Sequence, residues 1–139
     1  MRIVLDTDVV VAAMRSRTGA SAELLRRVRD GNVEAMATVA LALEYEMICQ
    51  RPEHQMASGY TRAEVVAFVD AVMAMMEPVR NHFRWRPQLR DPNDEHVLEA
   101  AINGRAEVLV TFNIKDFGDA ARFGIEVMRP GDALRRLNQ

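Results

Sequence analysis

Acidic side chains stand at three widely separated places in this chain of 139 residues. The stretch LDTD carries Asp6 and Asp8, LALEYEMIC carries Glu44, and RDPNDEH carries Asp91 and Asp94. Carboxylate oxygens are hard ligands, and they favour Mg²⁺ or Mn²⁺ over softer metals. If these side chains meet in space, they form a site for a divalent cation.

A fourth group of oxygen-bearing side chains lies in VTFNIKDF. Thr111, Asn113 and Asp116 follow an apolar run closely and would form a polar rim at its end. The alternative is that Asn113 and Asp116 are loop residues that bond their own backbone.

The first three groups also have structural explanations. Asp6 or Asp8 suits the N-cap of a following helix, but one helix start needs one cap. Asp91, with Pro92 after it, matches a helix start, and this explains Asp94 less completely. Glu44 falls inside the apolar arc of a helix, where a carboxylate needs a partner, which is either a metal or an arginine.

Other kinds of site are not indicated. The 3 histidines do not cluster, no Cys and His spacing suggests zinc, and no glycine-rich phosphate loop appears. The 1 cysteine excludes an internal disulfide and favours a reducing compartment. There is no signal peptide, and no apolar run approaches the roughly 18 residues of a membrane span, so we expect a cytoplasmic protein.

Net charge is −2, so any basic surface must be local. The strongly basic stretch is RNHFRWRPQLR, in which Arg84 and Arg86 stand beside aromatic residues, an arrangement that suits single-stranded RNA. The alternative is a solvated connector whose tryptophan fills the core. Arg15 and Lys115 flank the acidic stretches and are further candidate phosphate contacts.

Short apolar strands alternate with helices along the chain, which indicates an α/β fold with a parallel sheet in one domain, residues 1–139. The helix beginning at Thr61 has a capping box and Val and Met on several faces, so we expect it to be well buried. The predicted strands are 2–6, 33–40, 107–112 and 125–130, with a short one within 77–83. The predicted helices are 9–16, 21–31 capped by Ser21, 41–49 ended by Pro52, 61–76, 91–105 ended at Gly104, a short turn or helix at 119–124, and the C-terminal segment from 131.

Functional groups gather at the carboxyl ends of the strands of such sheets, where the strand order reverses. Asp6 and Asp8 directly follow the first predicted strand, and Asn113 and Asp116 directly follow strand 107–112. Both pairs therefore stand where this rule places a site.

The sequence resembles the PIN-domain family, in particular the VapC-like toxins of bacterial toxin–antitoxin pairs. The resemblance is carried by IVLDTDVVVAA, ALEYEMICQRPE and RDPNDEHVLEAAINGRAEVLVTFNIKDF, in this order over nearly the whole chain. It implies a three-layer α/β/α sandwich with a central parallel sheet of four to five strands. It also implies a Mg²⁺- or Mn²⁺-dependent endoribonuclease that acts on RNA, pairs with a cognate antitoxin and forms a homodimer.

Carried over by position, the resemblance implies a metal and catalytic site. Asp8 stands where the family usually has asparagine, and Asn113 where many members have aspartate, so the charge of the site is redistributed. The competing interpretations are a non-catalytic PIN-like module that binds RNA or protein, and a phosphoryl-transfer enzyme of the doubly wound type. The metal-binding and catalytic acids that the resemblance to the PIN-domain family implies are Asp6, Glu44, Asp94 and the more variable Asp116, with Thr111 and Asn113 as neighbouring polar residues.

Overall fold

The computed structural model of the protein describes residues 1–80 and 92–139, with side chains from residue 94 onward in the second range. A central sheet runs through this part of the chain, in the order β3-β2-β1-β4-β5, and every neighbouring pair is parallel. The predicted parallel sheet is therefore confirmed. Its strands are β1 (Arg2–Leu5), β2 (Glu34–Ala37), β3 (Glu77–Pro78), β4 (Val108–Val110) and β5 (Glu126–Met128).

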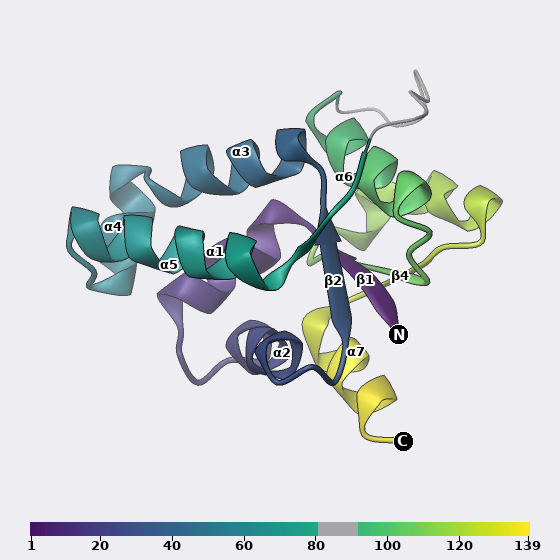
Figure 1. Cartoon of the computed structure of the whole chain (residues 1–139), viewed down its shortest axis with the longest axis horizontal. Coiled ribbons are helices and arrows are strands. Elements are labelled where there is room, and N and C mark those ends of the chain that lie inside the picture. Colours follow the sequence, from purple (N-terminus) through teal and green to yellow (C-terminus); the bar gives the residue numbers. More distant parts are fainter. Residues whose placement is uncertain (81–91) are drawn as a thin grey trace.

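Helices cover both faces of the sheet. In Figure 1, α1, α2 and α5 lie to one side of β1 and β2, and α6 lies to the other. This arrangement is the three-layer α/β/α sandwich that the sequence predicts. The helices of the described chain are α1 (Thr7–Arg15), α2 (Ala20–Arg29), α3 (Val39–Cys49), α4 (Pro52–Ser58), α5 (Arg62–Met75), α6 (Pro92–Asn103), the 3₁₀ segment η1 (Ile114–Phe123) and α7 (Pro130–Leu137).

The central strand β1 sits at the point where the strand order reverses. From β1 the chain adds β2 and β3 on one side, and later β4 and β5 on the other. Ile3, Val4 and Leu5 are fully buried, as expected for a strand covered on both faces. The carboxyl ends of β1 and β4 are therefore the edge at which the sheet rule places a functional site.

Two local expectations from the sequence, the Ser21 cap and the extent of the segment at 119–124, are wrong. Helix α2 begins after Gly19 as N-cap, and Ser21 lies inside it, buried, with a hydroxyl that forms no hydrogen bond in the described structure. Helix α3 does end before Pro52, as predicted, and Pro52 then opens α4, because proline suits the first turn of a helix, where its missing N–H costs nothing. The segment from Ile114 to Phe123 forms η1, longer than the predicted turn at 119–124.

Helix α5 is less buried than its composition suggests. Its N-cap is Thr61 with the predicted capping box to Glu64. Only one stripe of this helix, Val65, Val69 and Val72, is buried. The helix is therefore an outer helix that buries one stripe of an apolar surface. No helix in residues 1–80 and 92–139 is long and apolar enough to cross a membrane.

Candidate active site

Asp6 occupies the turn between β1 and α1. Its backbone N–H continues the sheet by donating to the Val110 carbonyl at 2.9 Å, and its side chain caps α1 by accepting from the Thr7 N–H at 2.7 Å. The second carboxylate oxygen accepts from the Thr111 hydroxyl, also at 2.7 Å. Asp6 therefore does serve as the N-cap, and its buried carboxylate also faces the end of β4.

Asp8 lies in the first turn of α1, so the cap role considered for it is wrong. Its Oδ2 accepts from the Phe112 N–H and from the Asn113 side-chain amide, each at 3.1 Å. These bonds tie the loop after β4 to α1. Its Oδ1 is buried and has no hydrogen-bond partner in the described structure, so this oxygen can accept a further ligand.

Thr111 completes the strand-end part of the site. It is fully buried at the end of β4, and its backbone N–H donates to the Met128 carbonyl at 3.0 Å. Its hydroxyl donates to Asp6 and accepts from the Asn113 N–H at 2.9 Å. One hydroxyl thus links the β4–η1 loop to the first acid, as the polar rim predicted from the sequence would require.

Glu44 reaches the same edge from α3. Thr38 caps this helix, with its hydroxyl accepting from the Leu41 N–H at 3.2 Å, and the second turn then presents Glu44. Glu44 is half-buried, and its Oε2 accepts from the Thr7 hydroxyl at 2.5 Å. Within residues 1–80 and 92–139 the partner of this carboxylate is a hydroxyl, and no described arginine forms an ion pair with it.

Asp94 lies in the first turn of α6, which begins at Pro92 as predicted. It is half-buried, and its negative charge is one of the causes that raise the pKa of Asp6. Helix α6 therefore brings Asp94 near Asp6. Asp6, Glu44 and Asp94 come from three separate elements to one edge of the sheet.

The surroundings of Asp6 disfavour the ionised form of its carboxyl group. Burial raises the pKa of Asp6 to about 7, with the Asp8 charge as the second cause, against the lowering effect of the Thr111 and Thr7 hydrogen bonds. Burial also raises the pKa of Asp8. Two adjacent carboxylates with little water hold protons unless a cation is near them.

The donor set fits a hard divalent cation in its chemistry. All the grouped ligand atoms are oxygens, and the buried Oδ1 of Asp8 lacks a partner. The side chains do not yet form a complete coordination shell. Among the described residues, no three or more Asp, Glu, His or Cys side chains are arranged so that they could hold one metal ion. An ion that uses three carboxylates would require side-chain rotation or bridging water, and Mg²⁺ commonly keeps several waters.

The structure does not bring every predicted residue together. Asp116 is exposed at the start of η1, where its backbone N–H donates to the Asn113 carbonyl at 3.0 Å, and Lys115 beside it is exposed too. Arg15 is exposed at the opposite end of α1 from Asp6, about 13 Å along the helix. Asp91, Arg84 and Arg86 lie outside the described residues.

Sequence reasoning missed two residues that contact this edge. Thr7 donates its hydroxyl to Glu44, and Tyr45 donates its hydroxyl to the Leu5 carbonyl at 2.5 Å. The apolar arc of α3 correctly indicates that the Tyr45 ring is buried. No local pattern reveals the hydroxyl partners, because they lie 37 and 40 residues away along the chain.

Comparisons with known proteins agree with this fold. A PIN-domain family model matches residues 2–115. The Mycobacterium tuberculosis protein named "Putative ribonuclease VapC50" is 37% identical over 79 residues, which are 55% of this chain and 39% of that protein. The chain thus matches well under half of the length of this relative.

A solved structure extends the fold comparison over most of the chain. VapBC2 from Rickettsia felis, crystallised with a DNA fragment from its promoter, contains a chain that matches with a TM-score of 0.63. The match covers 91% of this chain and 98% of that one at 16% identity, so it shows likeness of fold alone. The family model spans the strands and helices that carry Asp6, Glu44 and Asp94. On these grounds, this chain belongs to the PIN-domain family.

Proposed function

We propose that the protein is a metal-dependent endoribonuclease, the toxin of a toxin–antitoxin pair. The observation that carries this proposal is the buried Asp6 carboxylate beside Asp8, at the switch point of the sheet, with a pKa raised to about 7. Strongly perturbed acids in such a position are typical of functional sites. The likeness to a VapC-named relative and to a VapBC2 chain supports the same class.

Asp6, Glu44 and Asp94 would hold the principal Mg²⁺ or Mn²⁺ ion. The bound ion would supply the Lewis acidity that activates water and offsets charge on the phosphate. Asp8 holds the β4–η1 loop through Phe112 and Asn113, which keeps the Thr111 hydroxyl on Asp6. Asp116, exposed at the rim, would support this ion or a second one after a change in side-chain position.

RNA would approach this edge from the solvent side of η1. Lys115 is exposed two residues beyond Asn113, and it is the described basic residue best placed to contact a phosphate near the acids. Arg84 and Arg86 would add phosphate contacts and base stacking from their aromatic stretch. Arg15 lies at the far end of α1, so it would contact the RNA only at a phosphate some distance from the cleaved one.

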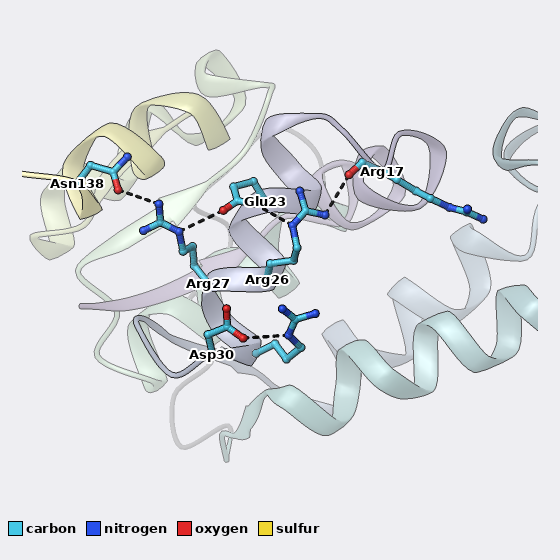
Figure 2. A network of polar contacts seen from close by, with 7 residues as sticks. Arg17, Glu23, Arg26, Arg27, Asp30 and Asn138 are labelled. Atoms are coloured by element: carbon cyan, nitrogen blue, oxygen red, sulfur yellow. Dashed lines mark hydrogen bonds and ion pairs between the residues drawn. The ribbon is translucent and has the colours of Figure 1, made fainter.

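The proposed antitoxin partner is a protein with an acidic, amphipathic segment. An apolar groove of about 240 Å³ lies between α1, α2 and α5, lined by Leu25, Tyr60 and Phe68 among others, with arginines at its rim. Figure 2 shows Arg17 and Arg26 together, with the Arg26 guanidinium donating to the Arg17 carbonyl at 3.0 Å. Carboxylates on one face of a partner helix would complement these arginines, while its apolar face filled the groove.

The proposed homodimer would use the outer face of α3. Val39, Leu43 and Met47 recur every fourth residue there, and they are 75%, 59% and 62% exposed. Side chains at this spacing form one stripe along a helix, and a second copy of the same stripe can pack against it about a two-fold axis. Substituting Leu43 with Lys should lower the apparent mass measured in solution if this stripe is the interface.

The direct test of function is RNA cleavage by matched variants. We expect the purified protein to cleave single-stranded RNA with Mg²⁺ or Mn²⁺ and to stop when EDTA removes the ion. Asp6→Asn and Glu44→Gln should each abolish most cleavage. Glu46→Gln should not, because Glu46 lies on the same helix but is exposed away from the site.

The non-catalytic alternative predicts a different result. A PIN-like binding module would bind RNA or protein without cleaving RNA, and Mn²⁺ would not bind to it in a titration. Full cleavage by both Asp6→Asn and Glu44→Gln would reject the assignment of these residues.

A further inference from the structure

Two neighbouring residues of α3 both contact the segment around Asp6. Glu44 accepts from the hydroxyl of Thr7, the residue after Asp6, at 2.5 Å. Tyr45 donates its own hydroxyl to the carbonyl of Leu5, the residue before Asp6, also at 2.5 Å. Asp6 therefore stands between two hydroxyl contacts to a helix about forty residues away in the sequence.

Tyr45 fixes the distance between α3 and β1. Its side chain is fully buried, and a buried hydroxyl must find a hydrogen-bond partner to avoid a desolvation cost. The Leu5 carbonyl is that partner, so the bond forms only when α3 lies at one depth against the end of β1. Burial raises the pKa of Tyr45, and the charges of Asp6 and Glu44 raise it further, so the ring lies near both carboxylates.

Thr7 fixes the direction of Glu44. A glutamate has several rotatable bonds and loses considerable freedom when it is held in one conformation. The Thr7 hydroxyl holds Oε2, which leaves Oε1 for another ligand. The Thr7 backbone N–H holds Oδ1 of Asp6 at 2.7 Å, so one buried residue contacts both acids.

We propose that Thr7 and Tyr45 are positioning residues that set the Glu44 carboxylate beside Asp6 for binding of a divalent cation. Thr7 sets the orientation of the carboxylate, and Tyr45 sets the depth of the helix that carries it. This inference rests on the proposed nuclease function, because it concerns the same cation. It assigns roles to two residues that would not touch the substrate or the ion.

The test compares hydroxyl removal with hydroxyl retention. Thr7→Val keeps the shape of the side chain and removes the donor, whereas Thr7→Ser keeps the donor. Tyr45→Phe removes one hydroxyl from a ring that stays buried. Thr18→Val is the matched control, because Thr18 is exposed in the loop between α1 and α2.

Mn²⁺ affinity, measured by calorimetric titration, is the first readout. We expect Thr7→Val to bind Mn²⁺ about 10-fold to 100-fold more weakly, as is typical when a partner of a metal ligand is lost. Tyr45→Phe should weaken binding by about 10-fold. Thr7→Ser should restore affinity to near that of the unmodified protein, which a role in packing alone would not predict.

The second readout needs no metal. In the metal-free protein, the carboxyl carbon resonance of Glu44 in a ¹³C NMR spectrum should shift in Thr7→Val and stay in place in Thr7→Ser and Thr18→Val. An unmoved Glu44 resonance in Thr7→Val, or unchanged Mn²⁺ affinity in Thr7→Val and Tyr45→Phe, would overturn the positioning roles. If the unmodified protein cleaves no RNA but the NMR shifts occur, the function fails and the positioning geometry stands.

Discussion

The two halves of the candidate site are built differently. At the ends of β1 and β4, Asp6, Asp8, Thr111 and Asn113 form a continuous set of hydrogen bonds that joins two strands and a helix start. On the helix side, Glu44 is held by one hydroxyl, and the half-buried Asp94 stands in the first turn of α6. The sheet thus fixes its acids through several hydrogen bonds of the fold, whereas Glu44 depends on the single hydroxyl of Thr7.

This difference suggests that the two halves of the site have different roles in cation binding. Backbone bonds of the sheet and the start of α1 hold Asp6 and Asp8 close together despite their like charges. Burial and the repulsion from Asp8 disfavour the ionised form of Asp6, which lowers the stability of the folded protein at neutral pH. A bound cation would stabilise the ionised carboxylates and offset this loss. Glu44, held beside Asp6 by the Thr7 hydroxyl, would then add its carboxylate to the cation.

Loss of the strand-half acid should have the largest effect. Asp6→Asn should lower metal-dependent RNA cleavage by at least about 100-fold, because the buried carboxylate proposed to bind the ion is lost. Glu44→Asp should be milder, since the shorter carboxylate on α3 can still reach the ion through water. Single-turnover cleavage rates at saturating Mn²⁺ would compare the two, and a larger loss in Glu44→Asp would reverse the proposed order.

The stability of the metal-free protein should depend on pH through Asp6. Its pKa of about 7 in the folded chain exceeds the ordinary 3.8, so between these values the folded chain binds a proton that the unfolded chain does not. The free energy of unfolding should therefore fall as pH rises from about 4 to 7, by an amount on the order of 4 kcal/mol, and then level off. Urea unfolding across this range in EDTA measures it.

The same unfolding experiment distinguishes the contribution of Asp6 from that of Glu44. Asp6→Asn should remove most of the slope, whereas Glu44→Gln should leave most of it. Saturating Mn²⁺ should reduce the slope in the unmodified protein, since an ion stabilises the ionised carboxylates. A slope that survives in Asp6→Asn would show that another group is responsible.

Asp116 should have the smallest effect among the proposed ligands. It is exposed on η1, and no hydrogen bond or ion pair joins its side chain to Asp6 or Asp8 in the described structure. Asp116→Asn should therefore change cleavage by less than about 10-fold and Mn²⁺ affinity still less. A loss equal to that of Asp6→Asn would place Asp116 in the principal site and require η1 to move.

The strand half is also the part that the sequence predicts best. Apolar runs that end in Asp6 and in Thr111 indicate buried strands, and parallel strands place their carboxyl ends on one edge. Glu44 follows from helical spacing alone. These features are local, and local patterns suffice to predict them.

Other features depend on contacts between distant residues. Helix α4 packs against α1, and this contact between distant segments leaves no pattern in the local sequence. The outer face of α5 stays exposed although its composition is apolar. The hydrogen bonds from the Thr7 hydroxyl to Glu44 and from the Tyr45 hydroxyl to the Leu5 carbonyl form only when α3 docks on the β1–α1 turn.

The central claim is that acids from β1, α3 and α6 share one divalent cation. Anomalous X-ray diffraction from crystals soaked in Mn²⁺ tests it most directly. We predict a manganese peak about 2.0–2.6 Å from a carboxylate oxygen of Asp6, with Glu44 and Asp94 bound to it directly or through water. A crystal that shows manganese elsewhere and none at this edge, from protein that cleaves RNA, would contradict the account.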